Sequence, residues 1–279
     1  MLYTIKNDKL SAKIDALGAQ LRQISASDGH EYMWCADERI WDGTAPILFP
    51  VVGRVKGGSY FYEDKEYKMT IHGFAMEKEF SLVQNSGESI VLALESDEST
   101  KAVFPFDFRL EIKFSLSGSK LLAQHTVINK GMGDMYFSIG AHPAFACDIG
   151  DTLVFEKKEN IKAHKLENDL LGPADADFLT DENEWTIKAD SFDDDAYILN
   201  GLASRRVTLK RRAGRDVAFR FDAPYLGIWA KPGASYVCIE PWFGVDESAA
   251  HDRRLVNRPG IVKLAQNGSF TLWYEAELF

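Results

Sequence analysis

Hydrophobic and polar side chains alternate along several segments of the chain, and this pattern constrains the fold more than any other feature. In residues 109–116, leucine, isoleucine or phenylalanine occupies every second position. Residues 217–221 and 270–278 show the same alternation. Because successive side chains of a strand point to opposite faces, a period of two indicates strands with one buried face. The chain is therefore predicted to be all-β.

Turn residues between such segments indicate hairpins. Asn7-Asp8 precedes a strand-like segment at 9–14, and Glu63-Asp64-Lys65 joins segments 59–62 and 66–69. Short polar turns of this kind connect antiparallel neighbours. We therefore predict a large antiparallel β-sandwich, in which sheets pack face to face.

Helical signals are few. Residues 246–254 could form about two helical turns, but Pro259-Gly260 follows closely and would end a helix. We therefore expect one-turn helices in loops only. The acidic stretch 167–195 has no clear period and is predicted to be a long surface excursion between strands. Because no Gly/Ser-rich or Pro-rich spacer divides the chain, residues 1–279 are predicted to form one domain.

The charge of the chain limits its partners. Its 32 basic and 42 acidic residues give a formal net charge of -10, which repels nucleic-acid phosphates and anionic membrane surfaces. No apolar run approaches the roughly 18 residues of a membrane span, and the first residues lack the basic and apolar regions of a signal peptide. We therefore predict a cytoplasmic protein with a small-molecule partner, and neither a nucleic-acid nor a membrane partner.

The cysteines do not indicate a cross-linked or metal-bound fold. Cys35, Cys147 and Cys238 are odd in number and widely spaced. Neither a disulfide framework nor a CxxC metal site fits this spacing, so buried free thiols are expected.

Two histidines stand in similar local sequences. His72 and His142 each follow a strand-like segment and precede residues that turn the chain. Rigid strand ends commonly present reactive groups, and imidazole exchanges protons near neutral pH. Either histidine alone is more often a hydrogen-bonded structural residue. Two histidines could also bind a metal, but they are 70 residues apart and no cysteine accompanies them, so no metal site is predicted.

Glu240 is the third candidate for proton transfer. It follows the apolar segment 236–239 and precedes Pro241-Trp242. A carboxyl group buried beside aromatic rings has a raised pKa and is a better base. The alternative is a strand-end carboxylate paired with Arg54 or Lys231.

Arg54 ends a long apolar run that two prolines bracket, at residues 46–55. A guanidinium group offers five N–H donors in a rigid fork, which can fix the oxygen atoms of a polyol. The alternative is an arginine at the edge of the core that pairs with a carboxylate.

With these residues in view, the chain resembles the aldose 1-epimerase (galactose mutarotase) superfamily, and most closely its LacX-type branch. The resemblance covers almost the whole chain. It implies a β-supersandwich with a sugar in an open cleft, and interconversion of the α and β anomers of a free hexose without a cofactor. The segments that carry it are Leu10–Ile14, Leu17–Leu21, Gly53-Arg54, His72-Gly73-Phe74, His142-Pro143 and Glu240-Pro241-Trp242.

The resemblance also implies roles for individual residues. Glu240 corresponds to the catalytic base, and His142 to the general acid that protonates the ring oxygen. Arg54 and His72 correspond to sugar-binding positions.

The family's central aspartate matches the segment 192–199, where three consecutive aspartates blur the register. Asp195 is preferred as the acceptor for two sugar hydroxyls, with Asp194 next; a solvated acidic turn is the alternative. Trp229 and Trp242 are predicted to contact the apolar face of the pyranose, with core packing as the alternative.

Departures from the galactose mutarotase motifs leave the substrate open. Gly73-Phe74 stands where two glycines are usual, and Pro241-Trp242 stands where the family has Thr-Gln. The partner is therefore predicted to be a monosaccharide or a sugar phosphate. The alternatives to a free-hexose mutarotase are a hexose-6-phosphate mutarotase, a non-catalytic carbohydrate-binding protein, and a glycoside hydrolase or lyase. No oligomeric state is predicted.

Overall fold

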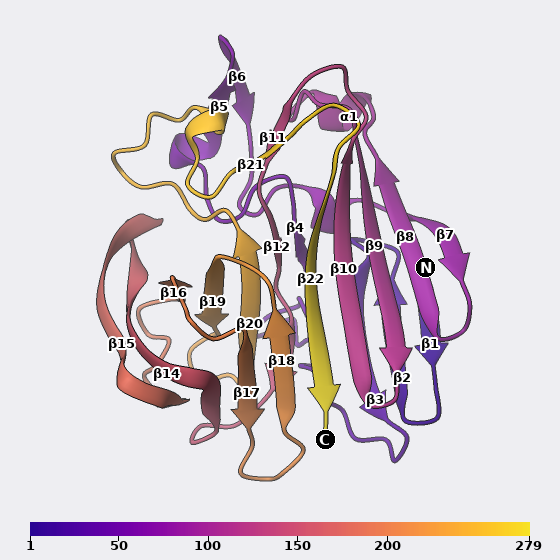
Figure 1. Ribbon diagram of the computed structural model, residues 1–279, viewed down its shortest axis with the longest axis vertical. Coiled ribbons are helices and arrows are strands. Elements are labelled where there is room, and N and C mark those ends of the chain that lie inside the picture. Colours follow the sequence, from indigo (N-terminus) through magenta and orange to yellow (C-terminus); the bar gives the residue numbers. More distant parts are fainter.

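Strands dominate the molecule, as the alternating pattern predicts (Figure 1). In the computed structural model, which describes residues 1–279, fifteen strands form one antiparallel sheet, and seven more form three small sheets. The first part of the large sheet contains β4 (Ile47–Leu48), β12 (Ile139–Ala141), β20 (Tyr236–Phe243), β19 (Tyr225–Trp229) and β16 (Tyr197–Asn200), with β13 (Ala144–Ala146) also paired to β20.

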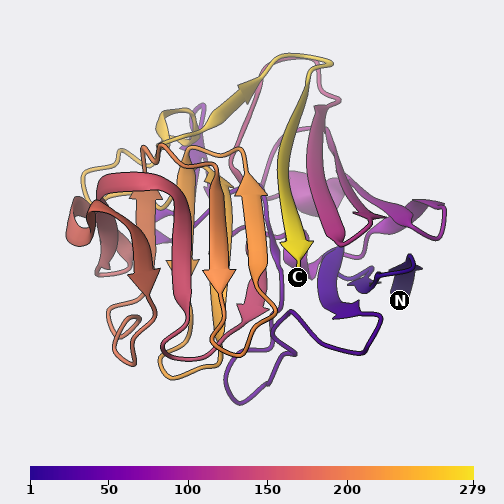
Figure 2. The same cartoon turned by 60° about the horizontal axis from the view of Figure 1, so that its bottom comes forward.

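The second part of the sheet lies beyond the long strand β14 (Thr152–Glu167), to which β15 (Leu170–Thr186) is paired. It contains, in order, β17 (Arg206–Lys210), β18 (Val217–Phe221), β22 (Ser269–Leu278), β10 (Lys120–Asn129), β9 (Phe108–Ser117), β8 (Ser89–Glu95) and β7 (Ser81–Asn85). In Figure 2 the strands coloured from red to orange stand side by side, to the left of β22 in yellow.

The strand β14 connects the two parts of the sheet. Its first residues, Thr152 to Phe155, pair with β17, whereas His164 near its other end pairs with β16. One continuous strand therefore belongs to both parts, so that the sheet can fold over on itself.

The two parts pack face to face around an apolar core. Phe145 of β13 lies 5.8 Å from Phe219 of β18, and Phe243 of β20 lies 4.8 Å from Phe270 of β22, measured between ring centroids. The main core cluster contains 69 buried residues. The predicted all-β antiparallel sandwich is therefore confirmed.

The remaining elements are short. The small sheets are formed by β1 (Leu2–Lys6), β2 (Leu10–Asp15) and β3 (Gln20–Ala26), by β5 (Ser59–Tyr62) and β6 (Lys65–Lys68), and by β11 (Met135–Phe137) and β21 (Val262–Leu264). The helical elements are α1 (Glu98–Lys101), η1 (Lys56–Gly58), η2 (Ala75–Glu77) and η3 (Leu255–Asn257). The expectation of one-turn helices is confirmed, and residues 246–254 form no helix.

The predicted surface excursion at 167–195 is wrong for most of its length. Residues 170–186 form strand β15, which pairs with β14 through several register shifts. The shifts interrupt the alternation of buried and exposed side chains, and the outer edge of β15 has no partner strand. The hydrophobic and polar side chains of β15 therefore do not alternate with a period of two, and the sequence pattern does not predict this strand.

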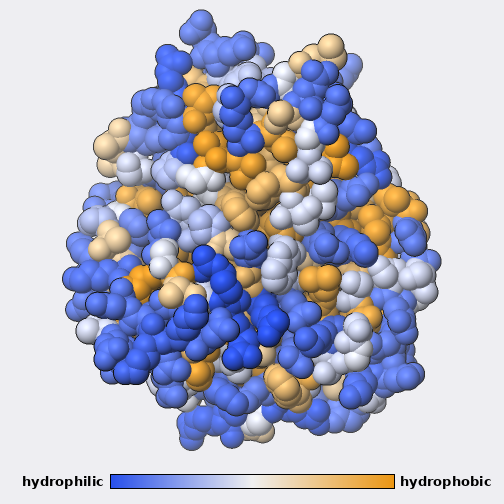
Figure 3. Space-filling model, viewed as in Figure 1, coloured by the Kyte–Doolittle hydropathy of each residue, from blue (hydrophilic) through white to orange (hydrophobic).

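No helix of the protein is both long enough and apolar enough to cross a membrane. On the face shown in Figure 3, hydrophilic residues predominate and hydrophobic residues form scattered groups. All three cysteines are free; Cys147 and Cys238 are buried as expected, whereas Cys35 is exposed.

Candidate active site

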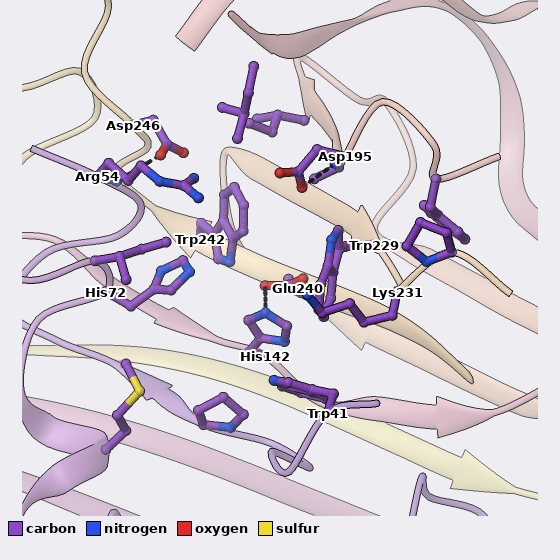
Figure 4. Close-up of a pocket in the computed structure, with 18 of the residues that line it drawn as sticks. Trp41, Arg54, His72, His142, Asp195, Trp229, Lys231, Glu240, Trp242 and Asp246 are labelled. Atoms are coloured by element: carbon purple, nitrogen blue, oxygen red, sulfur yellow. Dashed lines mark hydrogen bonds and ion pairs between the residues drawn. The ribbon is translucent and has the colours of Figure 1, made fainter. Parts of the chain in front are cut away.

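Strand pairing and the loops between strands bring the predicted residues together in one cleft of about 480 Å³ (Figure 4). The cleft opens beside β20, on the side opposite to the core contact that Phe243 makes. Every predicted site residue except Asp194 lines it: Arg54, His72, His142, Asp195, Trp229, Glu240 and Trp242.

The register of two short strands places His142 next to Glu240. Gly140 of β12 is opposite Trp242, and Ala144 of β13 is opposite Cys238. His142 lies midway between Gly140 and Ala144 and is therefore level with Glu240. Pro143, which follows it, separates the two strands, because proline lacks the N–H that would continue the ladder.

Glu240 and His142 form a buried pair at the bottom of the cleft. His142 Nε2 lies 3.3 Å from Glu240 Oε2, and the two side chains are only 10% and 2% exposed. Burial raises the pKa of Glu240 well above its usual value, although the nearby Trp242 indole N–H acts in the opposite direction. Burial lowers the pKa of His142 to about 4. These shifts favour a pair that carries one proton. The alternative pairing of Glu240 with Arg54 or Lys231 does not occur.

The backbone around His72 is held in an uncommon conformation. His72 has φ of 61° and Gly73 has φ of 76°, both in the left-handed region. A Cβ atom on Gly73 would lie 2.3 Å from the carbonyl oxygen of Phe49, so this position requires glycine. The resulting tight turn directs the imidazole of His72 toward His142, at 5.9 Å between ring centroids.

A backbone hydrogen bond fixes the protonation of His72. The N–H of Gly53 donates to His72 Nδ1 at 3.1 Å. Since Nδ1 is then an acceptor, the proton of the neutral imidazole is on Nε2. Burial lowers the pKa of His72 to about 3, so the ring is neutral at ordinary pH and presents an N–H donor.

Arg54 is positioned from two sides. Its backbone N–H donates to Asp246 Oδ1 at 2.7 Å, and its guanidinium Nη2 lies 3.3 Å from Asp169 Oδ1. Asp169 belongs to the turn between β14 and β15 and is exposed. Both alternatives given for Arg54 therefore apply: it pairs with a carboxylate, and it lines the cleft.

The structure distinguishes the two predicted aspartates. Asp195 faces the cleft, whereas Asp194 is exposed and does not line it. Asp195 has φ of 64°, and its Oδ1 accepts a hydrogen bond from the N–H of Ala196 at 2.7 Å. Lys165 Nζ donates to the backbone oxygen of Asp195 at 2.8 Å. These contacts hold the turn that precedes β16.

Tryptophans form the apolar walls of the cleft. Trp229 is half-buried, whereas Trp242 is 4% exposed and packs against Gly140, where a Cβ atom would meet its ring at 2.7 Å. Trp41, which the sequence analysis missed, lies 5.1 Å from the His142 ring and 5.5 Å from Trp229. Trp41 belongs to no regular strand, so no periodic pattern marks it.

Asp246 is the second missed residue. It lines the cleft and is 3% exposed, and burial raises its pKa. The local sequence after β20 indicated only a short helix, so the contact between Asp246 and the backbone of Arg54 was not predictable from it.

The structure places Cys238 near His142. Ligand atoms of His142, Cys238 and Glu240 lie within 4.8 Å of one another, and all three side chains are buried. The sequence analysis named no cysteine beside the histidines, because pairing of β13 with β20 joins residues distant in sequence. These three side chains are the ones that could hold a metal ion.

Comparisons with known proteins identify the family of the chain. A family model described as aldose 1-epimerase matches residues 1–262. The chain is 30% identical to protein LacX of Lactococcus lactis subsp. lactis, in its plasmid and chromosomal forms, over 283 residues and 95% of each chain.

Solved structures match over nearly the full chain. A galactose mutarotase related enzyme from Lactobacillus acidophilus is 29% identical with a TM-score of 0.95, covering 100% of this chain and 97% of its own. A galactose mutarotase-like protein from Lactobacillus casei ATCC 334 is 26% identical with a TM-score of 0.90, covering 100% of both chains. Family match, curated relatives and fold agree, and the chain therefore belongs to the aldose 1-epimerase family.

Proposed function

We propose that the protein is a mutarotase that interconverts the α and β anomers of a free aldose. The observation that carries this proposal is the contact of 3.3 Å between His142 Nε2 and Glu240 Oε2 at the bottom of a cleft. Mutarotation requires one group that removes a proton and one that supplies a proton, within reach of the same sugar carbon.

The closeness of the pair fits this reaction. The anomeric hydroxyl oxygen O1 and the ring oxygen O5 are both bonded to C1, so they lie side by side. Groups that exchange protons with them must also lie side by side, as Glu240 and His142 do. Glycoside hydrolysis instead uses two carboxyl groups about 5–9.5 Å apart, and the partner of Glu240 is an imidazole.

The proposed reaction proceeds through the open-chain aldehyde. The single proton of the pair first moves from Glu240 to His142 across their 3.3 Å contact. The Glu240 carboxylate then takes the proton from the O1 hydroxyl, the His142 imidazolium gives a proton to O5, and the C1–O5 bond breaks. Rotation about C1–C2 then presents the other face of the carbonyl. The same two transfers in reverse close the ring as the opposite anomer. The sugar keeps its composition and redox level, and each group returns to its starting protonation state.

The other cleft residues would bind the sugar. His72 presents an N–H donor, Arg54 presents guanidinium donors, and the Asp195 carboxylate accepts from hydroxyls. Trp41 and Trp229 offer flat apolar surfaces to the C–H groups of a pyranose. A volume of about 480 Å³ is within the range of small-molecule sites.

The charges of the cleft favour a neutral sugar over a sugar phosphate. Its two lining cations are Arg54 and Lys231, and Arg54 is already paired with Asp169. Asp193, Asp195 and other carboxylates line the same cleft. In Figure 4, Arg54 and Lys231 lie on opposite sides of the site, so they do not converge on one phosphate.

The pair also favours an enzyme over a sugar-binding protein without turnover. Burial of Glu240 raises its pKa, and burying a carboxyl group costs free energy. A protein that only forms hydrogen bonds with sugar hydroxyls does not need such a buried group, whereas an acid/base catalyst uses its shifted pKa. A protein that binds sugar without turnover can use exposed hydrogen-bond donors and acceptors instead of a buried pair.

The proposal is tested by saturation-transfer NMR of anomer exchange with glucose, galactose and their 6-phosphates. We expect exchange above the uncatalysed rate for at least one free aldose, and slower exchange for its 6-phosphate. Exchange that is faster for the phosphates would refute the free-aldose assignment and retain the mutarotase. Binding of several aldoses without exchange of any would refute the mutarotase.

A further inference from the structure

The proposed proton transfers leave one neighbouring group unused. Cys238 precedes Glu240 by two residues on β20, so both side chains point to the same face of the strand. The thiol is fully buried. Its sulfur atom and one ligand atom each of His142 and Glu240 lie within 4.8 Å of one another.

We infer that His142, Cys238 and Glu240 form a binding site for a thiophilic divalent cation such as Zn²⁺, and that the bound cation inhibits the enzyme. The inhibition rests on the proposed mutarotase function, whereas the binding site stands on the geometry alone.

The three side chains match the ligand preferences of the ion. Imidazole nitrogen, thiolate sulfur and carboxylate oxygen bind Zn²⁺ at about 2.0–2.3 Å, which places ligand atoms about 3.3–3.7 Å apart around a tetrahedral ion. His142 Nε2 and Glu240 Oε2 are already 3.3 Å apart. The ligand atom of Cys238 lies within 4.8 Å of a ligand atom of each of the other two side chains, about 1 Å beyond the spacing of a bound tetrahedral ion.

The site also has unsatisfied buried atoms. Glu240 Oε2 and His142 Nδ1 are buried and have no hydrogen-bond partner. Buried polar atoms without partners are uncommon and costly. A bound cation would satisfy the carboxylate oxygen directly.

Charge balance favours the cation. Zn²⁺ with one thiolate, one carboxylate and one neutral imidazole carries no net charge, which suits a buried site. The Nε2 atom of His142 already faces the carboxylate oxygen of Glu240. Cys238 binds as the thiolate, so metal binding releases the proton of the thiol.

The cation and the reaction exclude each other. Three protein ligands leave a fourth tetrahedral position, and His142 and Glu240 both line the cleft, so this position is reached from the sugar side. A cation on Glu240 Oε2 and His142 Nε2 occupies the atoms that exchange protons with the sugar. The ion therefore acts as an inhibitor, not as a cofactor.

The test is a titration of chelator-treated protein with Cd²⁺ and Zn²⁺, read in two ways. Cd²⁺–thiolate bonds absorb in the ultraviolet and report binding without any assay of activity. We expect one equivalent to produce this band and to stop anomer exchange, with reversal by EDTA. Cys238→Ser should abolish the band and raise the metal concentration for half-inhibition by at least about 10-fold. Cys35→Ser, which removes the exposed thiol, should change neither.

Two results would overturn the site. One is a band of equal size in wild type and Cys238→Ser, and the other is equal inhibition of both. If Cys238→Ser does not fold, the variant Cys35→Ser with Cys147→Ser leaves Cys238 as the sole thiol; its band supports the site, and absence of a band refutes it. Absence of exchange activity with every sugar refutes the mutarotase but not the site, because the Cd²⁺ band is measured independently.

Discussion

Burial acts on the two residues of the proposed acid/base pair in opposite directions. It raises the pKa of Glu240 and lowers the pKa of His142 to about 4. The carboxyl group thus holds a proton more tightly than in water, and the imidazole holds one less tightly. The resting proton of the pair therefore lies on Glu240. Once it has moved to His142, the imidazolium is a stronger acid and the Glu240 carboxylate a stronger base than the free side chains.

The pH dependence of exchange follows from these shifts. The reaction needs one proton on the pair, and the acid limb of the rate profile marks the uptake of a second proton. Because the pKa of His142 is lowered from 6.5 to about 4, the second proton is taken up only near pH 4. Exchange rates measured by NMR at a series of pH values, with circular dichroism to confirm folding, should therefore hold down to about pH 4. An acid limb near pH 6.5 would contradict the buried pair.

Asp195 and Asp194 offer a matched comparison of neighbouring carboxylates. Asp195→Asn keeps the side-chain acceptor for the N–H of Ala196 but loses the charge that faces the cleft. Hydrogen bonds to charged groups contribute about 1.5–3 kcal/mol, so KM should rise roughly 10- to 100-fold. Asp194→Asn makes the same chemical change outside the cleft and should leave KM unchanged. Equal changes in KM for the two variants would show that the turn at Asp194 and Asp195 affects sugar binding only through its total charge.

The site residues were predictable where local sequence and family resemblance coincided. Glu240 follows an apolar strand, and His72 and His142 end strand-like segments, so each could be named before the fold was known. Trp41 and Asp246 were missed because their position in the cleft depends on packing between distant segments. No residue-level pattern encodes such a contact.

At the scale of elements, strand register builds the site. Glu240 and His142 meet because β12 and β13 both pair with β20 and leave one unpaired step between them. Strands with one buried face, such as β9, could be predicted from their alternation, and the β5–β6 hairpin from its turn. Strand β15 could not, because its register shifts and free edge remove the alternation.

The hairpin of β14 and β15 also positions Asp195. Lys165 of β14 donates to the backbone oxygen of Asp195, and its ammonium group lies 3.9 Å from the centroid of the Tyr197 ring. Lys165→Met removes both contacts and frees the turn, so KM should rise about 5-fold, corresponding to roughly 1 kcal/mol, with a smaller change in kcat. Steady-state kinetics checks this split.

The control for Lys165 is another lysine of the same strand. Lys162 pairs with the exposed Asp177 of β15, and neither residue lines the cleft. Lys162→Met should leave KM unchanged. A loss of kcat in Lys165→Met without a rise in KM would contradict a positioning role.

At the scale of the whole molecule, the sandwich contains a buried histidine outside the cleft. His125 of β10 is 1% exposed, and neither ring nitrogen has a hydrogen-bond partner. Burial lowers its pKa from 6.5 to about 3. The unfolded chain therefore binds a proton that the folded protein does not, and stability is lost as pH falls from about 6.5 toward 3.

Substitution of this histidine should reduce acid sensitivity. Between pH 6.5 and 5, the contribution of His125 to the loss of unfolding free energy is about 2 kcal/mol. Urea unfolding of wild type and His125→Leu at both pH values measures this contribution. Any change in packing affects the variant equally at both pH values, so it cancels when the losses of unfolding free energy are compared. The variant should lose about 2 kcal/mol less than wild type. Equal losses would show that His125 does not contribute to the acid sensitivity.

The central claim is that Glu240 and His142 perform the proton transfers, and one measurement tests it most directly. Anomer exchange of the preferred aldose is followed by saturation-transfer NMR for wild type, Glu240→Gln and His142→Asn, with sugar binding measured on the same samples. We predict that both variants bind the sugar and lose exchange by roughly 100- to 10,000-fold, whereas Asp194→Asn retains it. A folded variant of either residue that exchanges anomers at the wild-type rate would contradict the account.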